Sequence, residues 1–305
     1  MVSVLKDFLM IAAVASIGIW IPRHYFGGAT QMFSTLARVH PGHLTMPGAT
    51  SNLGHAWFIS TVLLSSLGGC VWPHIFGASF TAKSGDILRR NAIVLPFYAI
   101  SYGFLFVAGF AALLVVPGLK DGDLSLLTVV RQVFPPWMLG LIGGAGALTA
   151  MVPAAILLLS ASTLFAKNLL RPMLAPGMSD DRVARMAKIT VVALGLISLH
   201  FAVYSSSTLV SLLLFGYAGV TQFFPGVCLG LFWKRVSTIG VFSGMVAGVG
   251  GTVVLLLSGR DPVAGLNAGF LALCANFAVT VLVSLWSPAS ASLLEEAPAA
   301  VAPVS

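Results

Sequence analysis

An interrupted apolar segment carries the side chains and backbone breaks best suited to bind a ligand. It contains a glycine pair, Gly68-Gly69, followed by Trp72-Pro73-His74. In hydrocarbon every backbone N–H and C=O needs a partner, so a helix broken by Gly and Pro is tolerated where the freed groups line a cavity or meet a ligand. Two interpretations stay open: a ligand-binding break, or glycines that admit a neighbouring helix beside a simple kink at Pro73.

His74 is one of the few ionisable groups inside an apolar segment, because every Lys, Arg, Asp and Glu falls in a loop or at a segment boundary. Such groups are functional candidates, since burying a charge is costly. His74 either donates to an oxygen of a bound molecule or bonds a neighbouring carbonyl and stabilises the break. The sequence contains no paired intramembrane carboxylates, no His-Glu-x-x-His and no Gly-x-Ser-x-Gly, so it predicts neither catalytic residues nor an enzyme.

Two later segments place oxygen atoms at membrane depth. The first contains Thr149 and Pro153, and the second contains Tyr217 and Gln222. Hydroxyl oxygens and a carbonyl freed by proline are hard ligands of the kind that alkali cations prefer, by extension from Ca²⁺ and Mg²⁺ chemistry. Alternatively, the threonine hydroxyl bonds the carbonyl one turn earlier. Gln222 either lines a polar pathway or joins two helices.

Composition assigns the chain to the membrane. Of its 305 residues, 58% are hydrophobic and only 8% charged, and the mean hydropathy is +0.98. The net charge of +7 does not indicate nucleic acid, because Lys and Arg form short clusters between apolar segments instead of one basic face. The expected partner is the lipid bilayer. The three cysteines match no metal-binding spacing, so no metal site and no cofactor are predicted.

Eight segments are long enough to cross the roughly 30 Å hydrocarbon core, which takes about 20 apolar residues. They run over residues 4–22, 56–80, 92–116, 137–166, 186–204, 209–232, 238–257 and 266–286. The glycines Gly240, Gly244 and Gly248 form a packing face in the seventh. Residues 22–54 are expected to be a long loop, and a short helix is expected between Asp123 and Pro135.

Alternate loops carry 11 and 5 of the Lys and Arg residues, which predicts that both termini are cytoplasmic. The larger set comprises Lys6, Lys83, Arg89, Arg90, Lys167, Arg171, Arg182, Arg185, Lys188, Lys234 and Arg235. We therefore expect a multi-pass protein of the cell (plasma) membrane. Residues 1–286 form its transmembrane domain, and residues 287–305 form a disordered cytoplasmic tail.

Several motifs, in order along the chain, resemble the sodium:solute symporter family, and in particular its monocarboxylate-permease branch. They are Trp72-Pro-His74, Ala82-Lys-Ser-Gly-Asp-Ile-Leu-Arg-Arg-Asn-Ala-Ile-Val-Leu-Pro96, Ala150-Met-Val-Pro-Ala-Ala155, Leu164-Phe-Ala-Lys-Asn168, Phe224-Pro-Gly226 and Leu229-Gly-Leu-Phe-Trp-Lys-Arg235. The resemblance implies an all-α, polytopic membrane helix bundle of about eight transmembrane helices. This bundle would be the second half of the LeuT-like inverted-repeat fold, a carboxy-terminal portion lacking the first helices.

The resemblance also implies functional residues. Substrate contacts are expected at Gly69, Trp72, His74, Tyr217 and Gln222. The ion-binding positions fall at Thr149, Val152 and Pro153, with Na⁺ as the coupling ion, although many members have two adjacent hydroxyl residues where this chain has Val152-Pro153.

The expected function is cation-coupled uptake of a small organic anion, such as a monocarboxylate, by alternating access. Two alternatives stay open. One is a non-transporting fragment, or half of a split transporter that needs a complementing amino-terminal segment. The other is a transporter-like membrane sensor.

Overall fold

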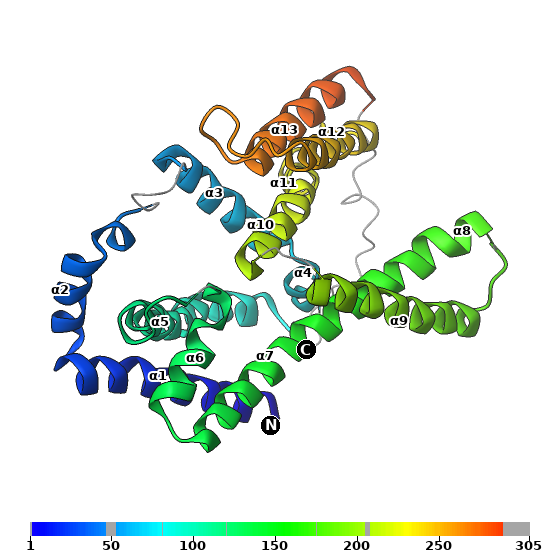
Figure 1. Cartoon of the computed structure of the whole chain (residues 1–305). Helices are drawn as coiled ribbons and strands as arrows, with labels where there is room; N and C mark the ends of the chain where they lie inside the picture. The colour runs from blue at the N-terminus through cyan, green and yellow to red at the C-terminus, as the bar shows by residue number, and fades with distance from the viewer. Residues whose placement is uncertain are drawn as a thin grey trace. The chain divides into compact units, whose positions relative to one another are not determined.

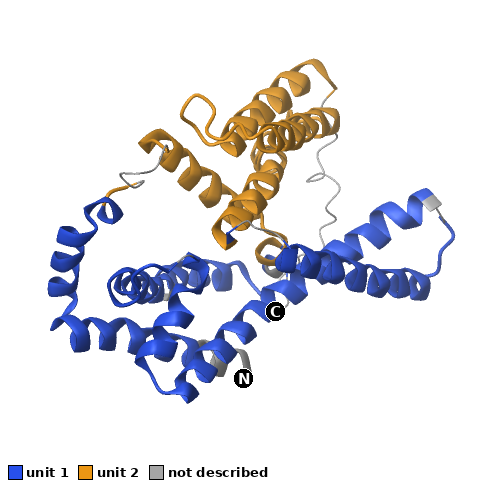
Figure 2. Cartoon of the chain, in the orientation of Figure 1, with its two compact units in different colours: residues 1–44, 77–208 blue, residues 45–76, 209–305 orange. Residues whose placement is uncertain are grey.

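The computed structural model describes residues 2–46, 53–80, 82–119, 121–174, 176–204 and 208–288. These ranges are helical throughout apart from connecting turns and one isolated bridge between Val263 and Leu266 (Figure 1). The chain divides into two compact units, drawn in different colours in Figure 2 and described separately below. Nearly all of the tail predicted to be disordered lies outside the described residues.

Unit 1 comprises residues 1–44 and 77–208. Its elements are α1 (Val2–Phe26), α2 (Ala29–Val39), η1 (Pro41–Leu44), α5 (Gly85–Val115), η2 (Gly122–Leu124), α6 (Ser125–Val133), α7 (Pro136–Leu164), the π-helical turn η3 (Phe165–Leu170), α8 (Arg171–Leu174) and α9 (Asp180–Tyr204). The short helix α4 (Pro73–Ser79) crosses the boundary between the units.

Unit 2 comprises residues 45–76 and 209–305. Its elements are α3 (His55–Val71), α10 (Leu209–Val220), the 3₁₀ turn η4 (Thr221–Phe223), α11 (Phe224–Phe232), α12 (Thr238–Leu257) and α13 (Ala268–Trp286). Across both units, eight helical stretches of the described residues are long and apolar enough to cross a membrane. Each overlaps one of the eight predicted segments, with ends that differ by up to seven residues.

The core of unit 1 forms where α1, α2, α5, α6 and α7 meet. Ile17 and Ile21 of α1 are fully buried, as are Met32 of α2 and Val129 of α6. Helices α1 and α5 approach so closely that a Cβ on Gly18 would lie 2.8 Å from the Cβ of Phe104. Apolar burial therefore holds α2 and α6, which are too short to be spans, against the membrane helices.

The prediction of a long loop over residues 22–54 was wrong for much of its length. Helix α1 continues through Pro22 to Phe26, where Gly27 adopts a positive φ of 79° and ends it. Helix α2 follows because Met32 and Leu36 lie one turn apart and are both fully buried. The average hydropathy of this region is too low for a span, which hid an amphipathic helix. The short helix expected after Asp123 is confirmed by α6.

Helices α12 and α13 of unit 2 lie side by side (Figure 1). A Cβ on Gly244 would collide with the Thr280 hydroxyl, and a Cβ on Gly240 would collide with that of Ser284. The glycine stripe is a packing face, as predicted, and it brings α12 against a row of buried polar side chains on α13.

Candidate functional site

The break predicted in the second apolar segment is present between α3 and α4. Trp72 has φ −56° and ψ 129°, outside the helical region. Pro73 explains this conformation, because a proline disfavours helical geometry in the residue before it and has no N–H to continue the hydrogen bonding. The Trp72 carbonyl accepts hydrogen bonds from the N–H groups of Ile75 and Phe76, at 2.9 and 2.8 Å. The break therefore starts a new helix within a single candidate span, residues 55–77.

Three rings gather at the break and are called the aromatic cluster: Trp72, His74 and Tyr217. The Trp72 ring lies edge-on to Tyr217 of α10, with centroids 5.4 Å apart and an interplanar angle of 90°. The His74 ring lies 5.7 Å from that of Trp72. Three of the five predicted substrate-contact residues are therefore brought together by the packing of α3 against α10.

Two polar atoms of the aromatic cluster are buried without a hydrogen-bond partner among the described residues. They are Nε1 of Trp72 and Nδ1 of His74. A buried donor left unpaired costs roughly 1–3 kcal/mol, so such atoms are expected to meet water or a ligand. The indole N–H can only donate. Whatever satisfies Trp72 must therefore offer an acceptor atom, such as a carboxylate oxygen.

Glycines determine how closely the aromatic cluster packs. A Cβ on Gly216 of α10 would lie 3.3 Å from Cη2 of Trp72, and a Cβ on Gly68 would meet the hydroxyl of Thr221 and lie 3.0 Å from Cδ1 of Tyr217. Gly69, predicted as a substrate contact, has open space around the position of its missing Cβ. Gly68 and Gly216 thus serve close packing, whereas Gly69 leaves room beside the break.

Gln222 lies in η4 and is only 1% exposed. Its amide nitrogen donates to the carbonyls of Ala218 at 3.0 Å and Gly269 at 3.2 Å. Its Oε1 lies 3.3 Å from Nδ2 of Asn276, which donates to the Gln222 carbonyl at 2.8 Å. Of the two interpretations of Gln222, these contacts favour a joint between helices; its contact with substrate stays a prediction.

Asn276 is the residue at this joint that sequence reasoning missed. It lies on α13, is 1% exposed, and carries one of the few amides inside an apolar segment. The Thr280 hydroxyl donates to its Oδ1 at 3.2 Å. An amide within a membrane segment was a visible signal, but its partner could not be named without the packing of α13 against η4.

The predicted ion-binding residues lie on α7, which runs unbroken through Pro153. The Thr149 hydroxyl donates to the carbonyl of Ala145 at 2.8 Å and lies 3.5 Å from the sulfur of Met10. This is the local bond that threonines commonly make in membrane helices. Pro153 has no N–H for the carbonyl four residues earlier, which is that of Thr149. Thr149 therefore offers a hydroxyl and a freed carbonyl, while Val152 is 45% exposed and contributes no side-chain oxygen.

Comparison with known proteins identifies relatives that match most of the chain. The family model described as "Sodium:solute symporter family" matches residues 1–248. The uncharacterized symporters YhjB and YodF of Bacillus subtilis are 42% and 30% identical over 93% and 92% of this chain. A monocarboxylate transport permease protein of Rhizobium johnstonii is 28% identical over 95% of the chain. The chain spans only 60%, 56% and 61% of the lengths of these three relatives.

Proposed function

This chain belongs to the sodium:solute symporter family, and we propose from that premise that it takes part in cation-coupled uptake of a small organic anion, such as a monocarboxylate. The observation that carries the proposal is Nε1 of Trp72 beside the helix break, which is buried and has no hydrogen-bond partner within the described ranges. The monocarboxylate permease among the relatives, 28% identical, supports the substrate class.

The charged side chains of unit 2 favour, as the substrate, a carboxylic acid that carries no amino group. The acidic residue in the described part of unit 2 is Asp261. Its Oδ1 already accepts hydrogen bonds from Nε1 of Trp57 and the N–H of Ala268, both at 3.0 Å and both outside the aromatic cluster. A carboxylate can satisfy Trp72 directly, whereas an ammonium group offers it only further donors.

The proposed mechanism is an exchange between outward-open and inward-open states. Substrate and cation shift this equilibrium only by as much as their affinities for the two states differ. In transporters with discontinuous helices, substrate and coupling ion bind where the helices are broken. On this ground we assign substrate contact to the α3–α4 break. Helix α7 is continuous, and we assign Na⁺ contact there to the hydroxyl of Thr149 and to its carbonyl, which Pro153 leaves without an N–H partner.

The test is uptake of labelled acetate, propionate and lactate, with proline as the amino-acid comparison, in cells with and without an imposed Na⁺ gradient. The cells would express the 305-residue chain alone, or the chain joined to the part of YhjB of Bacillus subtilis that the chain does not match. We expect Na⁺-stimulated uptake of the monocarboxylates in at least one of the two forms.

Three outcomes would decide against parts of the proposal. Uptake that ignores the Na⁺ gradient removes the assignment to Thr149. Uptake of proline but of no monocarboxylate removes the substrate class. Lack of uptake in both forms, with the protein confirmed in the membrane, favours a sensor or a non-transporting fragment.

A further inference from the structure

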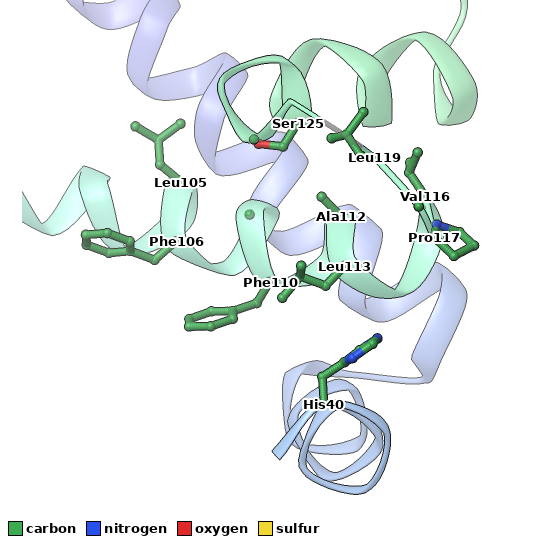
Figure 3. A pocket seen from close by; sticks show the side chains of 13 residues that line it. His40, Leu105, Phe106, Phe110, Ala112, Leu113, Val116, Pro117, Leu119 and Ser125 are labelled. Atoms are coloured by element: carbon green, nitrogen blue, oxygen red, sulfur yellow. The ribbon is translucent and has the colours of Figure 1, made fainter. Parts of the chain in front are cut away.

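Unit 1 contains a cavity of about 470 Å³, distant in sequence from the residues assigned to transport. One wall consists of six residues of α5 between Leu105 and Leu113, and the turn after α5 and Ser125 at the start of α6 close it. His40, at the end of α2, points toward this turn (Figure 3). The volume is within the range of small-molecule sites in proteins.

The polar and apolar groups of the cavity occupy different ends. Its α5 wall, which includes Leu105, Phe106 and Phe110, lies inside a candidate membrane span that ends at Val115. The lining side chains with polar atoms, His40 and Ser125, lie outside that span. Among the described residues that line the cavity, none carries a carboxylate, an ammonium or a guanidinium group. A molecule that fits this arrangement has an apolar body at hydrocarbon depth and a polar end at the membrane boundary.

The apolar wall continues along α5 as an exposed face. Leu95, Tyr102 and Phe106 are 64%, 46% and 68% exposed, and their spacing of seven and four residues places them on one side of the helix. A hydrocarbon chain in the bilayer therefore has an apolar path along α5 into the cavity.

We propose that the cavity binds an acyl chain of a membrane phospholipid, with the head group beside His40 and Ser125. Burial of methylenes against Leu105 and Phe110 supplies the affinity. The imidazole and the hydroxyl supply hydrogen bonds to head-group oxygens. The apolar wall of α5 favours this acyl chain over a small hydrophilic molecule.

Two glycines of α5 provide a matched pair of substitutions. Gly109 lines the cavity and Gly103 does not, and both have open space around the missing Cβ. Gly109→Leu fills the cavity, whereas Gly103→Leu places the same side chain on the same helix outside it. Both substitutions change helix propensity equally.

The experiment measures phospholipid retained by the purified chain in mild detergent, by native mass spectrometry. A phosphatidylcholine with a photoreactive acyl chain then maps the contact to peptides. We expect one retained lipid per wild-type chain, with label between Leu105 and Leu119. Gly109→Leu should lower retention about tenfold, and Gly103→Leu should leave it within about twofold of wild type. His40→Ala should alter the preference among head groups while the acyl label stays in place.

Several results would overturn the proposal. These are a wild-type chain that retains no lipid, label outside residues 105–119, and equal losses in the two glycine variants. If Gly109→Leu fails to reach the membrane, the lipid retained by the wild-type chain and the position of the photolabel on it still test the proposal. The same measurements would be made on the chain joined to the unmatched part of its relative. Loss of the retained lipid in this joined protein would show that the added part fills the cavity, and it would also overturn the proposal.

Discussion

At the scale of single residues, Trp72 is the residue on which the proposed substrate contact depends. Its indole N–H is buried without a partner among the described residues, and phenylalanine keeps most of the ring while removing the donor. We expect Trp72→Phe to raise the KM for monocarboxylate uptake about 10- to 100-fold, the cost of losing a hydrogen bond to a charged acceptor. Trp137→Phe is the control, because Trp137 is 67% exposed. Equal KM values for both variants would contradict the assignment.

Gly216 is a positioning residue for Trp72. A methyl group at this position would press on the indole at 3.3 Å, whereas a methyl group at Gly219 of the same helix meets open space. We expect Gly216→Ala to raise the KM about fivefold and Gly219→Ala to leave it unchanged. Both variants gain the same helix propensity, so the difference isolates the contact with Trp72.

A double-mutant cycle distinguishes this contact from a general loss of packing. In a Trp72→Phe background the ring no longer extends to Cη2, so Gly216→Ala should have little further effect on the KM. Additive effects of the two substitutions would show that Gly216 acts through something other than the indole.

At the scale of elements, the interruption between α10 and α11 depends on α13. In the 3₁₀ turn η4, the Gln222 carbonyl accepts a hydrogen bond from Nδ2 of Asn276 on α13. Oδ1 of Asn276 in turn accepts a hydrogen bond from the hydroxyl of Thr280, one turn later on α13. We expect Asn276→Ala to lower the free energy of unfolding by about 1–3 kcal/mol, because buried groups lose their partners. Thermal unfolding in detergent measures the effect. Leu282→Ala on the same helix is the control, since Leu282 is 57% exposed, and an equal loss in both variants would argue against the joint.

A second set of contacts ties the beginning of α3 to the turn before α13. Asn267, the residue before α13, donates two hydrogen bonds to α3. Its N–H donates to the hydroxyl of Ser60 at 2.9 Å, and its Nδ2 donates to that of Thr61 at 3.0 Å. Trp57 adds its bond to Asp261. Within unit 2, α3 is therefore held by α13 near one end and is broken at the other.

At the scale of the whole molecule, the distribution of Lys and Arg predicts the orientation of all eight spans. With both termini inside, a fluorescent protein fused after Trp286 should fold and emit light, because it does so in the cytoplasm. An alkaline phosphatase fused after Arg260 should be active, because that loop should lie outside. The opposite pattern in both fusions would reverse the predicted topology and the direction of the proposed uptake.

Much of the fold follows from the sequence, because hydropathy and proline chemistry act locally. Twenty or so apolar residues specify a span wherever their neighbours lie, and Pro73 breaks its helix through its own ring and missing N–H. Hydropathy missed the polar first turns of α5, where Asp86 and Arg89 form an exposed ion pair at 3.6 Å. It also missed α2, because the polar residues of an amphipathic helix lower its average hydropathy, and only the packing shows which face is buried.

Only the tertiary structure decided how the candidate site is assembled. Trp72, Gly216 and Tyr217 come from two helices far apart in the chain, and their contact depends on glycines whose role is visible only against a neighbour. Gln222 was ambiguous because one amide can serve a pathway or a joint, and Asn276 resolved its hydrogen bonding. The sequence by itself determined the membrane spans and the break at Pro73, since these depend on local energies. The partners of buried polar groups were decided by packing between distant segments, which local energies do not specify.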